Sequence, residues 1–369
     1  IPDDWEINGV DTDHDGIPDL DLKAMGADPN VPDIFIEADW MEYDGDEVNI
    51  MGAKEKIHKK STAPSPEALK MVYESFKEHG INVHIDAGPE SIMNYETGEK
   101  WGKLSSSYEP ESASASSSAS AIEYSDSFEL GSSFENWNRT AIENFTKNRW
   151  TTFKYCLFVN RYDNGYSTGI AENITGQFFI VSSGMISESE TIRDHDTALA
   201  GTIMHELGHT LGLSHGGIYT DCYTGKTVND HVNHKPNHFS IMNYNYQLGG
   251  LQTGTDSYKI DYQEFNLPEI DEENIDESLG IDPLGATKDC GLMFNFRDFD
   301  GTTITDIAER AIDFNEDGVL DYNLKYNLNG DKDEKTGEDI FGTLTATSNE
   351  WVNLKFTGGL IGRYGEDID

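Results

Sequence analysis

The chain has 369 residues, with 68 acidic and 26 basic side chains and a formal net charge of −42. A protein that binds nucleic acid or anionic membranes would carry the opposite sign, which argues against both classes. The length allows one large core, or a catalytic domain with a smaller companion. No apolar run is long enough to span a membrane.

Cysteine usage and the N-terminal sequence bear on the compartment. The chain begins at Ile1, and its charged first segment lacks the apolar core of a signal peptide, so we expect a processed product. Three cysteines are too few for a disulfide framework. Cys156 lies in an apolar run and is expected to be a buried free thiol, whereas Cys222 and Cys290 are either bridged or free.

An acidic loop dominates residues 1–30, which we expect to form an N-terminal calcium-loop segment. Oxygen side chains alternate there and are followed by Gly16, which permits a sharp turn, as in the first nine positions of an EF-hand loop. Leu22 stands where such a loop has Glu, so the loop is closer to the short calcium repeats of thrombospondin type 3. The alternative is a solvated acidic turn. The expected ligands are Asp11, Asp13, Asp15 and Asp19.

Alternating and helical patterns follow. Residues 32–40 predict a strand with one face in a core, and residues 81–87 predict a second strand. Between them, residues 66–79 predict a helix that starts near Pro66 and ends at Gly80. A strand, a helix and a strand in this order predict a right-handed crossover with parallel pairing.

The next stretch is less regular. Serine and alanine dominate residues 105–127, which predicts a mobile surface insert. A helix is expected near 134–147, and strands at 153–160 and 176–182. The last of these is either an interior strand or a sheet edge that pairs with an extended peptide.

The motif His-Glu-Leu-Gly-His-Thr-Leu-Gly-Leu-Ser-His covers residues 205–215, on a helix capped by Asp196 or Thr197. His205 and His209 are four residues apart, so their rings leave the same helix face and can bind one Zn²⁺. Glu206 is placed to act as a general base. Gly212 can end the helix, which allows His215 to return as a third ligand. The alternative is three histidines that fell by chance on a core helix.

A methionine turn follows at residues 240–244, Ser-Ile-Met-Asn-Tyr. With the zinc motif, it resembles the metzincin clan of zinc endopeptidases, especially secreted bacterial and archaeal members described as matrixin-like or reprolysin-like. The resemblance implies an α+β catalytic domain over 31–265, with a twisted mixed sheet and a long zinc-binding helix. It also implies an apolar floor under the metal at Met242, and a phenol at Tyr244 that stabilises the oxyanion, as in astacin-like and serralysin-like members.

Four further histidines lie near the motif. Three of them fall between the zinc motif and the methionine turn, where they are either ordinary residues of a polar loop or a second metal site. His195, just before the zinc helix, is expected to be ordinary. The three are His231, His234 and His238.

Residues 266–369 predict an acidic extension packed on the catalytic domain. Residues 261–281 predict an exposed helix pair, and residues 350–356 a strand or docking segment. Two calcium-type runs lie between them, with an acidic linker as the alternative; Lys332 replaces the usual glycine of the second. The expected ligands are Asp313, Asn315, Asp317 and Asp321, and then Asn327, Asn329, Asp331, Asp333 and Glu338.

Together these features predict a secreted, monomeric metalloprotease that binds zinc and calcium and cuts internal peptide bonds of proteins. Glu206 would take a proton from the attacking water and return it to the leaving amine, while zinc would polarise the scissile carbonyl. One alternative is a catalytically silent, calcium-dependent surface or adhesion protein with a protease-like domain. Another is a zinc hydrolase that does not cut proteins.

Overall fold

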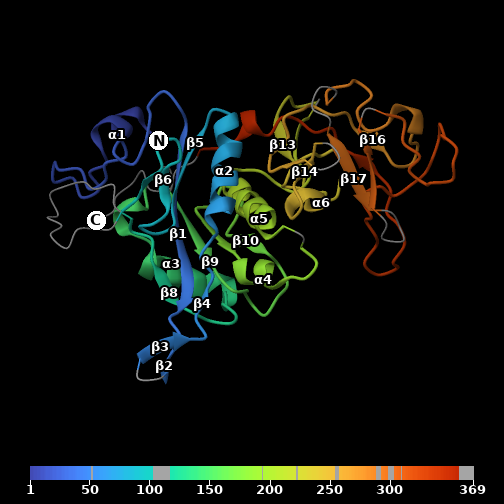
Figure 1. Ribbon diagram of the computed structural model, residues 1–369. Coiled ribbons are helices and arrows are strands. Elements are labelled where there is room, and N and C mark those ends of the chain that lie inside the picture. The colour runs from blue at the N-terminus through green and yellow to red at the C-terminus, as the bar shows by residue number, and fades with distance from the viewer. Residues whose placement is uncertain are drawn as a thin grey trace. The chain divides into compact units, whose positions relative to one another are not determined.

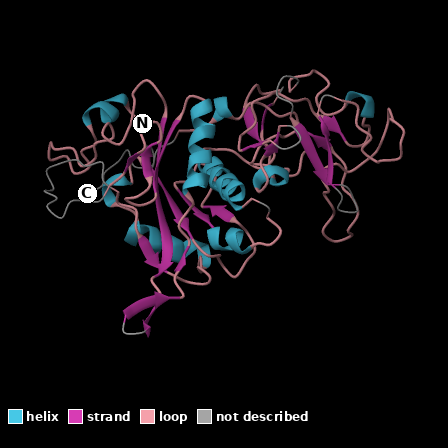
Figure 2. Ribbon diagram, in the orientation of Figure 1, coloured by secondary structure: helices cyan, strands magenta, loops and turns pink. Residues whose placement is uncertain are grey.

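The computed structural model describes residues 1–50, 53–102, 117–192, 194–221, 223–253, 257–287, 292–297, 303–308 and 310–356. It divides into two compact units, an N-terminal unit (Ile1–Leu211 with Phe356–Asp369) and a C-terminal unit (Gly212–Lys355). Both contain helices and strands (Figure 2), and the expected α+β class with a mixed sheet is confirmed. The division into segments 1–30, 31–265 and 266–369, which the sequence predicts, stays a prediction.

A seven-stranded mixed sheet forms the centre of the N-terminal unit (Figure 1). The strand order is β10-β11-β9-β1-β4, and β5 and β8 also pair with β1. Strand β1 is parallel to β5, β8 and β9 and antiparallel to β4. The strands are β1 (Asp33–Tyr43), β4 (Lys60–Ser61), β5 (Asn82–Asp86), β8 (Ala121–Glu123), β9 (Phe153–Phe158), β10 (Gly169–Ala171) and β11 (Phe178–Val181).

Helices cover both faces of this sheet. Helix α2 (Pro66–Glu78) contacts α5 (His195–Thr210), and α5 contacts β10 and β11. On the other side (Figure 1), α3 (Glu135–Asn144) adds Trp137 to the core that contains Phe35. The expected helix at 66–79 and its parallel crossover are confirmed. The hydroxyl of Ser65 begins this helix by accepting the N–H of Ala68.

Shorter elements complete the N-terminal unit. The expected insert at 105–127 falls mainly outside the described residues, which resume at Ser117. The remaining elements are α1 (Asp3–Asn8), β2 (Asp46–Ile50), β3 (Ala53–Ile57), β6 (Ile92–Asn94), β7 (Glu99–Lys100), α4 (Ser183–Glu188) and the 3-10 turns Ser132–Phe134 and Lys147–Arg149.

The strand predicted at 176–182 exists as β11 but is an interior strand. It pairs with β9 on one side and with β10 on the other. The edge is therefore β10, a short strand that the sequence pattern did not reveal.

Strand β1 is buried on both faces over its first seven residues, not on one face as its pattern predicts. The difference arises because Glu37 and Asp39, which read as solvent-facing, are completely buried. Arg149 donates to Glu37 and to Asp86 of β5, at 2.7 Å in each case. A buried charge needs such partners, because transfer out of water is otherwise too costly.

The C-terminal unit contains short strands and turns around its own apolar core. Phe239, Tyr246 and Phe314 belong to this core. A four-stranded antiparallel sheet has the order β15-β14-β17-β18. The elements are β12 (Ile218–Thr220), β13 (Thr227–Asn229), α6 (Tyr244–Gln247), β14 (Leu251–Gln252), β15 (Tyr258–Lys259), β16 (Ile270–Asp271), β17 (Met293–Arg297), β18 (Thr303–Ile307), β19 (Thr343–Leu344) and the 3-10 turns Glu277–Leu279 and Trp351–Asn353.

One expectation for this unit is wrong, and one of two alternatives holds for another. Residues 261–281 form no helix pair; they contain β16 and a 3-10 turn. Glu272 and Glu277, which read as exposed helix residues, are buried and accept backbone N–H groups of later loops. The segment 350–356 contains a 3-10 turn instead of a strand, and it is a docking segment, the second alternative: the buried Trp351 donates to Asp261 at 2.8 Å.

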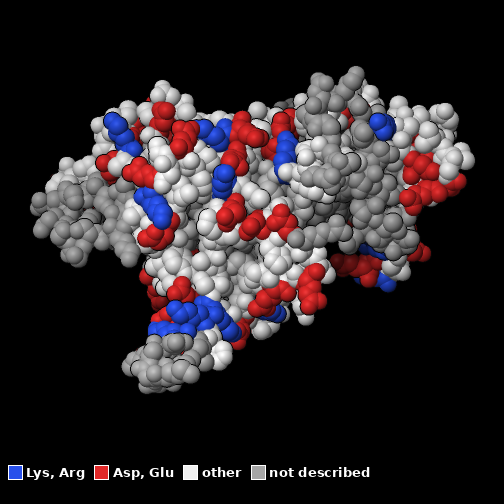
Figure 3. Space-filling view, in the orientation of Figure 1, with Lys and Arg blue, Asp and Glu red and all other residues white. Residues whose placement is uncertain are grey.

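The surface carries both charge signs in spite of the acidic excess. Basic groups gather near the β2–β3 hairpin (Figure 3), where Lys56 and Lys59 pair with Asp44 and Lys60 pairs with Asp126. Among the described residues, no helix is long and apolar enough to cross a membrane.

Replacement of Asp39 by Asn is predicted to flatten the pH dependence of stability. Burial raises the pKa of Asp39 to about 7, although bonds from Ser120 and Tyr155 oppose the rise. Between about pH 4 and pH 7 the folded protein then holds a proton that the unfolded chain releases, so stability falls as pH rises. The loss is roughly 1.4 kcal/mol for each pH unit in this window.

Urea unfolding of both proteins across this window measures the difference. We expect the stability of the unsubstituted protein relative to Asp39→Asn to decrease steadily with pH. A constant difference between the two proteins would contradict the raised pKa.

Candidate metal centre

Helix α5 begins at His195, and Asp194 rather than the expected Asp196 or Thr197 caps it. The Asp194 carboxylate accepts the backbone N–H groups of Asp196 and Thr197, which have no partners inside the helix. All residues from Ala198 to Thr210 are buried. The helix ends before Gly212, whose φ of 94° suits glycine because no side chain opposes it.

The histidines of the motif come together. The rings of His205 and His209 lie 4.8 Å apart and are perpendicular, as expected for one helix face. Within this short segment, one ring nitrogen from each of His205, His209 and His215 lies within 4.8 Å of the other two. Three imidazole nitrogens at this spacing fit a transition-metal ion such as Zn²⁺.

Glu206 is buried beside the edge strand β10. Burial raises the pKa of its carboxyl to about 8, and the backbone N–H of Ala171 opposes this rise by hydrogen bonding. A cation held by the neighbouring histidines would favour the ionised form further. Gly169 permits this packing, because a Cβ at that position would lie 2.5 Å from Glu206 Oε1.

Polar contacts fix the C-terminal end of α5, which carries His209. The N–H of Thr175 donates to the carbonyl of His209 at 2.9 Å. The buried ammonium of Lys154 donates to the carbonyl of Thr210 at 3.2 Å and to that of Gly176 at 2.8 Å. Burial lowers the pKa of Lys154 to about 8. A cation at a helix C-terminus is favourable, since the last carbonyls carry partial negative charge.

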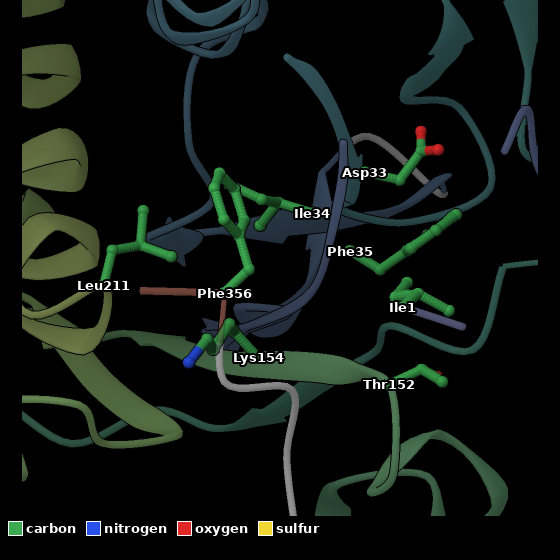
Figure 4. Close-up of a pocket in the computed structure, with 8 residues that line it drawn as sticks. All are labelled: Ile1, Asp33, Ile34, Phe35, Thr152, Lys154, Leu211 and Phe356. Carbon is green, nitrogen blue, oxygen red and sulfur yellow. The ribbon is translucent and has the colours of Figure 1, made fainter. Parts of the chain in front are cut away.

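Figure 4 shows Lys154 at a small cavity of about 30 Å³ within the N-terminal unit. In this view Leu211, Phe356 and Ile34 lie on the same side of β1 as Lys154, whereas Phe35 points to the other side. The eight residues that line the cavity are Ile1, Asp33, Ile34, Phe35, Thr152, Lys154, Leu211 and Phe356.

The methionine turn is tight and completely buried up to Asn243. The N–H of Asn243 donates to the carbonyl of Ser240 at 3.0 Å, and Met242 N–H donates to Ser240 Oγ at 3.1 Å. Asn243 also caps α6 by accepting the N–H of Asn245. Met242 has no exposed surface.

Tyr244 lies beside His215. Their ring centroids are 4.7 Å apart, and the ring of His234 lies 5.9 Å from Tyr244 on centroids. Tyr244 is 48 % exposed, so its phenol is accessible to a bound molecule.

The other histidines divide into two kinds. His195, His231 and His234 are exposed. His238 is completely buried, which the interpretation as a polar loop did not predict.

Cys156 is a buried free thiol as predicted, and burial raises its pKa well above the usual range. The pairing of Cys222 and Cys290 lies outside the described residues.

Two of the three acidic loops share one hydrogen-bond pattern. Asp11 Oδ2 accepts the N–H of Gly16 at 2.8 Å, and Asp313 Oδ2 accepts that of Gly318 at 2.7 Å. Each of these carboxylates also accepts the N–H of the residue four positions later, at 3.2 Å. Carboxylate oxygens of Asp11, Asp13 and Asp15 lie within 4.8 Å of one another. The two loops therefore have the same backbone, although they are about three hundred residues apart in the numbering.

The remaining loop ligands differ. Asp19 instead accepts from the N–H and hydroxyl of Thr12. The N–H of Asp321 donates to Glu277. The third run does not repeat the pattern: Asn327 accepts the N–H of Gly330, and Asp333 starts a separate turn that Glu338 closes.

Comparison with known protein families and with curated proteins finds no match to this chain. The family resemblance therefore depends on the motif residues alone. Sequence reasoning missed Gly169, Lys154 and Thr175, since each acts through residues distant in the chain.

We predict that Gly169→Ala destabilises the protein because the new methyl group collides with Glu206. Overpacking of this kind costs about 1–3 kcal/mol. Denaturant unfolding measures the loss. Gly249→Ala is the matched control, because a Cβ there meets nothing within 4 Å. Equal stability of Gly169→Ala and Gly249→Ala would show that Glu206 does not pack against β10.

Proposed function

We propose that the protein is a zinc-dependent endopeptidase that hydrolyses internal peptide bonds of proteins. The observation that supports this most strongly is the combination of three clustered histidines with a buried glutamate between the first two. Three nitrogen ligands leave one coordination position for water or substrate, as in catalytic rather than structural zinc sites.

The chain's own residues supply the proton transfers. His205, His209 and His215 would hold the zinc ion, which would polarise a carbonyl and increase the acidity of water. Glu206 accepts the proton of the attacking water and passes it to the leaving amine. Its burial beside Gly169 and Ala171 excludes bulk water and fixes the carboxylate in one place.

The substrate class follows from the resemblance to metzincins and from the sheet edge. The exposed phenol of Tyr244 beside His215 supports a role in stabilising the oxyanion. The edge strand β10 lies against Glu206, so an extended peptide that pairs with this edge would reach the general base. Met242 would provide the apolar floor of the clan.

Calcium is proposed as a stabilising cofactor of the acidic loops, in an extracellular enzyme that works as a monomer. The shared backbone of the loops at 11–19 and 313–321 supports this, because carboxylates alternate there as calcium ligands do. Calcium that binds only the folded form stabilises it by mass action.

We predict that Glu206→Gln abolishes proteolysis and retains zinc. The amide keeps the shape of the carboxylate but cannot accept the proton, and loss of a general base typically costs about 10²–10⁴ in rate. Cleavage of casein with and without 1,10-phenanthroline measures activity, and elemental analysis of the purified protein measures zinc.

Two outcomes would contradict the proposal. Undiminished cleavage by zinc-loaded Glu206→Gln would remove Glu206 from the mechanism. A folded, zinc-loaded parent protein that cleaves nothing would favour the silent adhesion protein.

We predict that calcium raises the free energy of unfolding, by about 2.7 kcal/mol at a concentration one hundred times its dissociation constant. Asp13→Ala should reduce the number of bound calcium ions by one in equilibrium dialysis. Asp221→Ala is the control, since Asp221 also accepts backbone N–H groups in an exposed turn, but one outside the proposed loops and with no other acidic residue over 221–226. Equal stoichiometry in both variants would contradict calcium binding at residues 11–19.

A further inference from the structure

His238 bridges the backbone of His215 and a buried carboxylate, Glu350, that lies 112 residues further along the chain. Its Nδ1 lies 2.9 Å from the carbonyl oxygen of His215, and its Nε2 lies 2.9 Å from Glu350 Oε1. A carbonyl oxygen only accepts hydrogen bonds, so the partners assign a proton to Nδ1. Both His238 and Glu350 are completely buried, and all three residues belong to the C-terminal unit.

The second oxygen of Glu350 is also used. Glu350 Oε2 accepts the N–H of Gln263 at 2.9 Å, and the Gln263 side chain accepts the N–H of Phe239 at 2.8 Å. Phe239 follows His238 directly, so these bonds hold the backbone on both sides of the imidazole. A buried hydrogen-bond network in which every polar group has a partner favours a single arrangement, because breaking any bond would leave a buried group without a partner.

The loop that carries His215 is also held by an ion pair between the buried Lys235 and the partly buried Asp230. The Lys235 ammonium donates to the carbonyl of Gly216 at 3.0 Å and to Asp230 at 2.9 Å. The N–H of Gly216 and the hydroxyl of Ser214 both donate to the backbone carbonyl of Asp230. The carbonyl of His215 therefore accepts from the imidazole of His238, and the next carbonyl, that of Gly216, accepts from the ammonium of Lys235.

Space around His238 is as restricted as its hydrogen bonding. Gly217 has a φ of 80°, and a Cβ at this position would lie 2.9 Å from His238 Nε2. Glycine at position 217 therefore leaves the room that the imidazole occupies, and a larger residue there would displace the ring from its partners.

We propose that His238 and Glu350 are positioning residues for His215, so that the C-terminal segment is part of the metal centre. The proposal rests on the zinc function above and adds residues outside its motif. A ligand on a loop is held less firmly than one on a helix, and outer partners of metal ligands typically change affinity about 10- to 100-fold.

Matched variants test the proposal. Glu350→Gln removes the carboxylate charge that faces His238 Nε2, so the charge-assisted bond is lost; the amide can accept from Gln263 and only donate to a neutral imidazole. Glu277→Gln is the control: Glu277 is equally buried and accepts one N–H on each oxygen, from Phe314 and Asp321. Both variants should lower the midpoint of unfolding. Only Glu350→Gln should also lower the affinity for zinc, by about 10- to 100-fold as measured by competition with a chelator.

The visible absorption of cobalt(II), bound in place of zinc, reports ligand geometry directly. We expect the cobalt(II) spectrum to change in Glu350→Gln and to stay unchanged in Glu277→Gln.

The His238 variants give a second comparison. In His238→Asn the cobalt(II) spectrum should stay the same, because the Asn amide nitrogen takes the place of Nδ1. In His238→Gln the spectrum should change. If Glu350→Gln does not fold, the comparison of the two His238 variants decides.

The outcomes separate this proposal from the zinc function. A parent protein that binds neither zinc nor cobalt(II) overturns the proposed function. A parent that binds zinc, with unchanged affinity and spectrum in Glu350→Gln and His238→Gln, overturns only the positioning role. Equal changes in Glu277→Gln would also overturn it, because loss of stability alone would then explain them.

Discussion

Burial of carboxylates that accept hydrogen bonds is the constraint on which both units depend. In the N-terminal unit, Glu37 and Asp86 share Arg149, and Asp39 accepts from Tyr155 at 2.8 Å. The C-terminal unit relies on Glu272, Glu277 and Glu350, which accept backbone N–H or imidazole groups from segments far along the chain. An unpaired buried carboxylate would be too costly, so each one specifies which segments must meet.

Local sequence patterns predict the elements close to the proposed site. The helix at 66–79, the strands near 32–40 and 81–87 and the helix of the zinc motif all follow from apolar spacing and capping residues. The clustering of the three motif histidines also follows, because one helical turn and one glycine turn determine it. What these patterns share is that every determining residue is near in sequence.

Long-range contacts explain what the patterns could not predict. Glu37 and Asp39 look like the solvent face of a strand, yet Arg149 lies 112 residues from Glu37. His238 looks like a loop histidine until Glu350, also 112 residues away, is placed beside it. Glycine at 169 carries no local signal at all, since its reason is the carboxylate of Glu206.

The same reasoning separates two kinds of acidic residue in a chain of net charge −42. Glu277 and Glu350 are satisfied by protein donors on both oxygens, so a cation would only compete with those donors. Asp13 lies in an exposed loop where the six carboxylate oxygens of Asp11, Asp13 and Asp15 share three backbone N–H donors. Repulsion among such carboxylates is relieved by a divalent cation, as calcium loops do. Stability of this protein therefore depends on its own donors in the interior, and under the calcium proposal it would also depend on dissolved cations at the acidic loops.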